Sequence, residues 1–424
     1  MNPPSHRTPE TPTKAVATVT PGPPGRALAP LYAAGFTTAF GAHSIAAGLG
    51  AESGGIGLGL LTFGVLLALY DVAEVILKPV FGSLSDRIGT KPVIIAGLLG
   101  FALASLLGTM GTTPLILGLA RLGQGAAASA FSPASSAAVA RLAGPGAAGS
   151  YFGKYGSWKG LGYMLGPLLG AGLIWVGGFP TLFMAMAIIS AAAALWVGIS
   201  MPALPVLPRP RYTIKDLVHQ STRRSFLIPT VALAGATGAL GVAVGFLPLL
   251  GTTLHLPLIA SMAMVAVLAL SSTLTQPLVG RWRDQGRISA RIGMSLGLAL
   301  IAAGIIPLAV APQPVMLYLA ALVIGCGIGI TTPLGFARLA STTPPERMGR
   351  TMGTAEIGRE LGDAAGPLIV GAIATTASIA AGLGTLALLI AIASVLSVLL
   401  LQRTTEAPAL HRQTEAPASQ KPNV

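Results

Sequence analysis

The stretch LYDVAEVILKPVFGSLSDRIGTKP, residues 69–92, decides the fold because it joins an apolar run to a dense set of charges. Its charged residues are Asp71, Glu74, Lys78, Asp86, Arg87 and Lys91. A charge near the centre of a bilayer costs at least ~3 kcal/mol on insertion scales. Charges inside the apolar part of this stretch are therefore candidates for function.

The composition of the whole chain predicts a membrane protein. Of its 424 residues 53% are hydrophobic and only 9% are charged, whereas an ordinary soluble domain has about 25% charged residues. So few charges leave the surface of a soluble protein uncovered. The one cysteine, Cys326, excludes an internal disulfide and a cysteine-based metal cluster.

Apolar runs of about 20 residues, the length that a membrane helix needs, recur along the chain. All are rich in Gly and Ala, which let helices approach closely in lipid. We therefore expect an all-α polytopic membrane protein with twelve transmembrane helices. They are predicted over residues 28–50, 57–81, 92–110, 114–139, 152–176, 180–201, 226–250, 257–280, 292–311, 315–337, 352–376 and 379–401.

Lysine and arginine predict the orientation. Of the 26 basic residues, 21 lie in the two tails and in the loops on one side, since only five lie within predicted helices. Basic loops mark the cytoplasmic side, so both termini are expected in the cytoplasm. The net charge of +13 then reflects topology, and we expect no nucleic-acid partner.

The two halves of the chain repeat each other. PVFGSLSD (79–86) and PLVGRWRD (277–284) share the pattern P-x-x-G-x-x-x-D. GKYGSWKGLGYMLGPL (153–168) likewise matches GTAEIGRELGDAAGPL (353–368). We therefore predict two pseudo-symmetric six-helix bundles with disordered cytoplasmic tails. The predicted boundaries are 1–26 for the first tail, 27–201 for the first bundle, 202–225 for a cytoplasmic loop, 226–402 for the second bundle and 403–424 for the second tail.

Three motifs carry a family resemblance that covers nearly all of the predicted helical chain. GSLSDRIGTKP resembles the signature loop of the major facilitator superfamily, RLGQGAAASA resembles its second signature, and GLGYMLGPLLG resembles the glycine–proline signature of its drug/proton antiporter branch. The matching residues are Gly82, Leu84, Asp86, Arg87, Gly89, Lys91, Arg121, Gln124, Gly125, Gly162, Gly166, Pro167 and Gly170. Gln285 stands where the second copy would need the counterpart of Arg87, which predicts a weaker or differently built gate there.

The resemblance implies that the second and eleventh helices face each other between the halves. Their charges then form an ion-pair gate, in which Asp86 meets the positive N-terminal end of the eleventh helix. We expect Arg87 and Lys91 to bridge to neighbouring acids. The expected gate residues are Lys78, Gly82, Asp86, Arg87, Lys91, Lys159, Glu356 and Arg359. For Lys159 and Arg359, contact with the substrate is the open alternative.

Ten charges lie within the predicted helices, five acids and five bases, so the membrane interior is balanced until one acid is protonated. Asp71 lies near mid-membrane and has no counter-ion on its own helix, which makes it our first candidate for carrying a coupling proton. A permanent pairing of Asp71 with Arg359 or Lys159 is the alternative. The other candidates for proton coupling are Glu74, Asp363 and Glu360.

Two further groups of residues are expected to serve alternating access. The first would line a substrate cavity: His43, Arg121, Gln124 and Tyr163. The second would bend helices or pack them closely, sealing the interface against leak, because proline removes a backbone hydrogen bond and glycine is permissive: Gly162, Gly166, Pro167, Gly170, Gly366 and Pro367.

The resemblance therefore implies a secondary transporter, a proton-coupled antiporter exporting a small organic molecule or drug. A proton-coupled symporter for metabolite uptake is the alternative, and a membrane-embedded enzyme or sensor is a remote one. The sequence has neither a HExxH metal motif nor a G-x-x-x-x-G-K-[ST] phosphate loop, so we expect no enzyme activity, metal or cofactor. The expected partners are the substrate, protons and lipid, around a monomer in a bacterial cytoplasmic membrane.

Overall fold

The computed structural model describes residues 24–52, 60–144, 146–206, 222–310 and 312–401, and these contain helices and no strand. The second predicted tail, residues 1–23 of the first and most of the predicted central loop lie outside these residues, whereas residues 24–26, predicted as tail, begin α1. The first half holds helices α1 (Pro24–Glu52), α2 (Leu60–Ile88), α3 (Thr90–Gly108), α4 (Pro114–Ala143) and α5 (Ala148–Ser200). The second half holds α7 (Arg224–Thr253), α8 (Leu258–Asp284), α9 (Ala290–Val310), α10 (Pro314–Thr342), the short 3-10 helix η1 (Pro345–Arg347), α11 (Met348–Thr376) and α12 (Ile379–Leu400).

The long helix α5 consists of two arms. Its backbone leaves the helical conformation at Gly177 (φ −159°, ψ 25°) and at Gly178 (φ 71°, ψ −171°), where a positive φ favours glycine. Pro180 then opens the second arm, a position that suits its fixed φ. The predicted helices at 152–176 and 180–201 are these two arms. Each of the twelve predicted spans thus overlaps a helix or an arm, and the prediction of an all-α polytopic membrane protein is confirmed.

Seven of the described helices are long and apolar enough to cross a membrane by length and composition. The seven do not include α2, α4 and α11, which carry the charged residues considered below.

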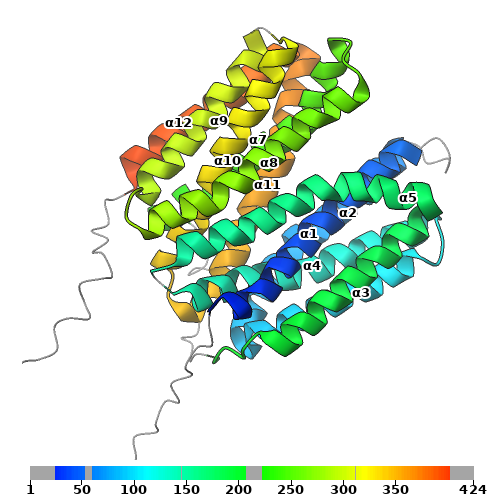
Figure 1. Cartoon of the computed structure of the whole chain (residues 1–424), viewed down its shortest axis with the longest axis vertical. Helices are drawn as coiled ribbons and strands as arrows, with labels where there is room; N and C mark the ends of the chain where they lie inside the picture. Colours follow the sequence, from blue (N-terminus) through cyan, green and yellow to red (C-terminus); the bar gives the residue numbers. More distant parts are fainter. Residues whose placement is uncertain (1–23, 53–59, 145, 207–221, 311, 402–424) are drawn as a thin grey trace, which may run out of the picture.

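The helices form two groups that correspond to the two halves of the sequence (Figure 1). One buried apolar cluster runs mainly through α1 to α5, and a second runs through α7 to α12. The halves contact each other chiefly where α2 meets α11 and where α5 meets α8. The expected pairing of the second and eleventh helices is therefore present.

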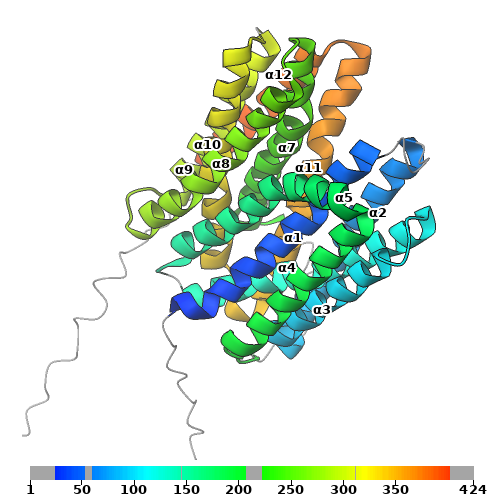
Figure 2. The same cartoon turned by 45° about the vertical axis from the view of Figure 1, so that its right-hand side comes forward.

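The first residue of α1 and the last of α12 lie at the same end of the molecule (Figures 1 and 2). We call this end the base and the opposite end the mouth. The halves meet closely at the base, because α2 and α8 end there against the first turns of α11 and α5. Towards the mouth the two groups of helices lean apart (Figure 1).

The glycines of α5 pack that helix against α1 of its own half. A Cβ on Gly162 would lie 2.7 Å from the Cβ of Ala39, and one on Gly170 would lie 2.5 Å from the carbonyl oxygen of Ser44. Gly366 of α11 similarly faces the backbone of Gly238 on α7. These contacts show the close packing that we expected of the glycines, and they lie within each half; sealing against leak stays a prediction.

Candidate functional site

Two carboxylates close the base by binding backbone groups of the opposite half. Asp86, at the end of α2, accepts hydrogen bonds from the backbone N–H groups of Gly349 (2.8 Å) and Arg350 (3.0 Å) in the first turn of α11. The unsatisfied N–H groups and the positive dipole end of a helix favour a carboxylate there. This is the contact that the sequence predicted for Asp86.

Asp284, at the end of α8, makes the equivalent contact with the first turn of α5. Its carboxylate accepts from the backbone N–H groups of Gly149 (2.9 Å) and Ser150 (2.6 Å). The second half therefore keeps the carboxylate contact in full. Gln285 changes only the residue that follows it, so the predicted weakening of this second gate finds no support in these hydrogen bonds.

The basic residues of the signature loop behave differently from our expectation. Arg87 is exposed and forms no ion pair with any residue that the structure describes. Lys91 donates a hydrogen bond to the backbone carbonyl of Gly198 (2.8 Å), near the end of the second arm of α5. A cation at a helix C-terminus is favourable, so Lys91 ties two helices of the first half together rather than bridging to an acid.

Mid-way between base and mouth, Lys78 of α2 lies among three carboxylates. Its Nζ atom is 2.8 Å from Glu360, 3.1 Å from Glu74 and 3.8 Å from Glu356. Lys78 is fully buried and both glutamates of α11 come from the other half. The cluster is an ion-pair bridge between α2 and α11, as the family resemblance together with the spacing of these charges implied.

Glu356 has further support that the sequence did not reveal. Its two carboxylate oxygens accept hydrogen bonds from the hydroxyls of Ser132 (2.5 Å) and Ser136 (2.6 Å) on α4. A buried charge requires such partners because it has lost its hydration. This serine clamp ties α11 to the first half at a second place.

Asp71 and Asp363 lie beside the cluster but outside it. Neither forms an ion pair with a described residue, so the alternative of a permanent pairing of Asp71 with Arg359 or Lys159 is absent here. Both carboxylates line a cavity of about 130 Å³, together with Glu74, Glu360 and Arg121. Glu74 and Glu360 serve the ion-pair bridge with Lys78, whereas Asp71 and Asp363 lack such a partner.

Arg121 of α4 reaches this cavity from a fully packed position. It is 2% exposed, donates to the carbonyl of Gly41 (3.2 Å) and lies over the ring of Tyr70, 4.4 Å from its centroid. Gln124, one turn on, instead donates to Ser105 (2.8 Å) and lines none of the cavities described here. Gln124 therefore links helices of the first half.

His43 and Tyr163 form the wall between α1 and α5. Their rings meet edge to face with centroids 4.5 Å apart, and His43 Nδ1 lies 3.2 Å from the carbonyl of Ala39. The hydroxyl of Tyr163 accepts a 3.4 Å hydrogen bond from Arg359 on α11. Tyr163 thus joins the aromatic wall of the first half to a cation of the second.

A wider cavity of about 660 Å³ continues from the same acids between α2, α5, α7, α8 and α11. Val72, Ile76, Val244 and Leu361 give it apolar walls, and Asp71, Glu360 and Asp363 line it as well. Pro167 and Pro367, related by the sequence repeat, are also among its lining residues. A volume of this size suits a drug-sized ligand, and all its lining residues lie on the mouth side of Asp86 and Asp284.

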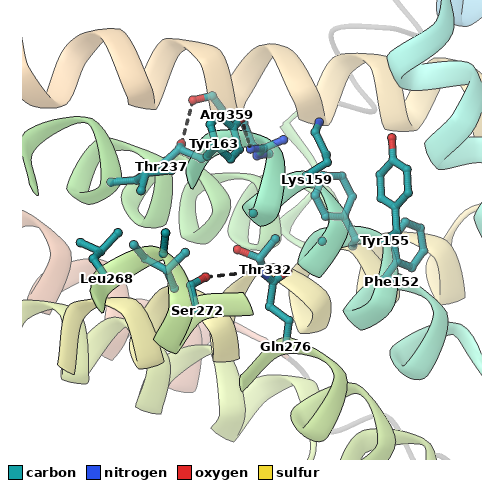
Figure 3. Close-up of a pocket in the computed structure, with 16 residues that line it drawn as sticks. Phe152, Tyr155, Lys159, Tyr163, Thr237, Leu268, Ser272, Gln276, Thr332 and Arg359 are labelled. Carbon is teal, nitrogen blue, oxygen red and sulfur yellow. Dashed lines mark hydrogen bonds between the residues drawn. The ribbon is translucent and has the colours of Figure 1, made fainter. Parts of the chain in front are cut away.

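A third, smaller chamber of about 50 Å³ lies at the centre, between α5 and the second half (Figure 3). Its lining includes Lys159, Tyr163, Arg359, Gln276 and Ser272. Tyr163 lines all three cavities, so they meet at this side chain. No group of three or more potential metal ligands occurs among the described residues.

One expected charge lies away from these cavities. Lys154 is exposed, its Nζ atom is 5.6 Å from the centroid of the Tyr151 ring, and it lines none of the three cavities. Lys154 therefore does not contribute to the charges around the cavities. Among the described residues, the cavities and the Lys78 cluster bring together five acids with four bases, namely Lys78, Arg121, Lys159 and Arg359.

Comparison with known proteins gives a family match and several relatives. Residues 27–367 and 230–423 match the Major Facilitator Superfamily. Over 108 residues, 26% of this chain, it is 38% identical to the class H tetracycline resistance protein of Pasteurella multocida, with 27% of that protein covered. Over 138 residues, 32% of this chain, it is 33% identical to the multidrug resistance protein MdtG of Enterobacter lignolyticus, with 33% of that protein covered.

The solved structures extend this likeness to the whole fold. The crystal structure of the human organic anion transporter MFSD10 (TETRAN) superimposes with a TM-score of 0.74, covering 89% of this chain and 100% of that one. At 20% identity this likeness shows the fold alone. The chain spans about a third or less of the length of the two curated relatives named above.

The two-half helical fold and the family match define a multi-pass membrane protein of a transporter family. The chain belongs to the Major Facilitator Superfamily. Its relatives include drug-resistance proteins of bacteria.

Proposed function

We propose that this chain is a proton-coupled antiporter that exports a small organic molecule across the cell membrane by alternating access. In this proposal both termini are cytoplasmic, the protein works as a monomer, and Asp71 carries the coupling proton with Asp363 as its partner acid. The excess of acids over bases in the interior carries the proposal. One bound proton makes that interior neutral, and its release restores a negative charge.

The position of the unpaired acids supports their assignment. Asp71 and Asp363 line the same cavities as Glu360, which belongs to the ion-pair bridge between the halves. A proton on either aspartate changes the electrostatic balance around Lys78 and Glu360. Proton binding is thereby linked to the contact that holds α2 against α11, which is the linkage an antiporter needs.

The paired contacts at the base support alternating access. Asp86 and Asp284 close the base on both sides of the molecule, while the wide cavity lies on the mouth side. With the termini in the cytoplasm this is an outward-facing conformation. The opposite conformation requires both carboxylate contacts to open as the halves rock around the central cavities.

The direction of transport is inferred from relatives. Two of them are named as resistance proteins, one against tetracycline and one against multiple drugs. Resistance is consistent with removal of a compound from the cell, so we favour export over uptake.

The test uses purified protein in liposomes with an imposed pH gradient and an internal pH dye. Small cationic, neutral and anionic drugs are added one at a time. Antiport predicts proton movement opposite to at least one compound, and Asp71→Asn should reduce that proton movement at least tenfold while exchange of labelled substrate across the membrane persists.

Lys154→Gln is the matched control, because Lys154 is charged and exposed and lines none of the three cavities. It should transport as the wild type does. Proton movement in the same direction as the compound would establish symport instead, and an unchanged pH dependence in Asp71→Asn would remove this residue from the mechanism.

A further inference from the structure

Lys159 of α5 is a buried cation without a bonded counter-ion. It is 6% exposed, and no carboxylate oxygen of a described residue lies within 4 Å of its Nζ atom. No hydrogen bond from Nζ is found within the described part of the chain either. Its Nζ atom lies over the ring of Tyr155, 5.9 Å from the ring centroid, in a cation–π contact. An ammonium group in such a place loses its hydration, and the carboxylates of Glu356 and Glu360 attract it from more than 4 Å away without bonding to it.

Arg359 of α11 presents a second cation to the same chamber (Figure 3). It is 5% exposed, and its Nε atom is buried without a hydrogen-bond partner. Only one of its terminal nitrogens is engaged by a side chain, at 3.4 Å from the hydroxyl of Tyr163. The chamber therefore holds two cations with unused donors, and none of its lining residues is an acid.

A role for Lys159 as a gate residue would need a carboxylate partner. Glu356 is an acid of the neighbouring cluster, but both of its oxygens already accept from Ser132 and Ser136. It is also bridged to Lys78, 3.8 Å away. The gate role predicted for Lys159 therefore has no carboxylate bonded to Nζ among the described residues. An anion from outside the chain can bind this ammonium group instead.

The chamber has the size of one small anionic group. Its volume of about 50 Å³ is sufficient for about three to five water molecules, since a buried water needs ~10–15 Å³. A carboxylate has three heavy atoms. Through Tyr163 and Leu240 the chamber adjoins the 660 Å³ cavity, whose apolar walls could hold the rest of a molecule.

We propose that Lys159 and Arg359 bind the anionic group of an amphipathic organic substrate, whose apolar body occupies the wide cavity. This deepens the transport function proposed above and rests on it. Lys159 borders two cavities, the central chamber and the acidic cavity of about 130 Å³ that Asp71, Glu74, Glu360 and Asp363 also line. Asp71, Glu360 and Asp363 disfavour an anionic group in the wide cavity, whereas Lys159 and Arg359 favour it in the central chamber, which no acid lines.

The test compares two probes that differ in charge and hardly in shape, 1-naphthaleneacetate and its neutral amide, 1-naphthaleneacetamide. Their dissociation constants for the full-length protein in detergent are measured by titration calorimetry at one pH. Because a charge-assisted hydrogen bond is about twice as strong as a neutral one, we expect the carboxylate to bind at least tenfold more tightly. Equal or weaker binding of the carboxylate, or no binding of it, would overturn the proposal without any variant.

Variants then locate the site. Lys159→Gln should bring the two dissociation constants within threefold of each other, while Lys159→Arg should retain most of the preference. Lys154→Gln, on the same helix but exposed, should keep the full preference. A preference that survives in a folded Lys159→Gln protein would contradict the assignment.

The binding measurement needs no gradient, so its outcome is separate from that of the proton-flux experiment. A preference for carboxylate without proton movement in liposomes would remove the antiport proposal and keep the anion site. Proton antiport of compounds that lack an anionic group, together with equal binding of the two probes, would keep the antiport proposal and remove the anion site.

Discussion

Asp86 and Asp284 occupy equivalent places in the two halves, and each binds two consecutive backbone N–H groups of a helix in the opposite half. The four hydrogen bonds measure 2.6 to 3.0 Å. The pair holds the base together at two separate contacts, α2 with α11 and α8 with α5. Both contacts must break for the base to open.

Removal of one of these carboxylates should shift the molecule toward a conformation with an open base. Hydrogen bonds to a charged group contribute about 1.5–3 kcal/mol each, so Asp86→Ala should raise the open population at least tenfold. Spin labels at Arg87→Cys and Arg287→Cys, with Cys326→Ser, report the distance across the base by electron paramagnetic resonance. Both labelled positions are exposed.

The same experiment has two internal checks. Asp284→Ala should produce a shift of similar size, because Asp284 makes the same number of hydrogen bonds as Asp86. Glu346→Ala, which removes an acid of η1 from the same face, should leave the distance distribution unchanged. Identical distributions in all the proteins would show that the two carboxylates do not control the base.

The helix packing of the first half gives a second prediction. Gly162→Ala should destabilise the protein by about 1–3 kcal/mol, the usual cost of overpacking, because its Cβ would meet Ala39 at 2.7 Å and the carbonyl of Phe36 at 2.8 Å. Gly172→Ala, on the same helix with nothing within 4 Å, is the control and should melt at or above the wild-type temperature. Thermal unfolding in detergent measures both, and equal melting temperatures would contradict the packing argument.

The fold could be predicted from the sequence because its signals are long and repeated. Apolar runs give the helices and the two repeats give the halves, while the family resemblance implies that the charged faces of α2 and α11 meet. The kink at Gly177 and Gly178 also falls between two predicted spans. The contact of Asp86 with α11 could be predicted because a helix N-terminus attracts a carboxylate wherever it lies.

The site could be predicted only in part because many of its contacts join residues far apart in the chain. Ser132 and Ser136 resemble the other small residues of α4, and nothing local shows that they meet Glu356, 224 and 220 positions away. The exposed position of Lys154 also depends on which way α5 is rotated in the bundle. Both lysines lie within one predicted helix, but the structure exposes Lys154 and buries Lys159.

The serine clamp gives a third prediction. The double variant Ser132→Ala, Ser136→Ala removes both hydroxyl donors from Glu356. Among the described residues, its remaining ion pair is then with Lys78, 3.8 Å away. Loss of two hydrogen bonds to a buried charge should lower stability by about 3–6 kcal/mol. Thermal unfolding is again the measurement, and Ser157→Ala, which removes one hydroxyl on α5, is the milder comparison. A double variant as stable as the wild type would show that Glu356 does not need the clamp.

The cluster around Lys78 gives the last prediction, and a double-mutant cycle isolates it. Lys78→Met should destabilise the protein by about 3–5 kcal/mol, because it leaves Glu74, Glu356 and Glu360 buried without their shared cation. Adding Glu360→Gln to Lys78→Met removes one of these charges and should recover part of the loss, whereas Glu360→Gln alone should destabilise. Chemical unfolding of the four proteins in detergent gives the coupling energy directly. Additive effects, with no recovery in the double variant, would mean that the 2.8 Å contact between Lys78 and Glu360 contributes nothing to the stability of the bridge.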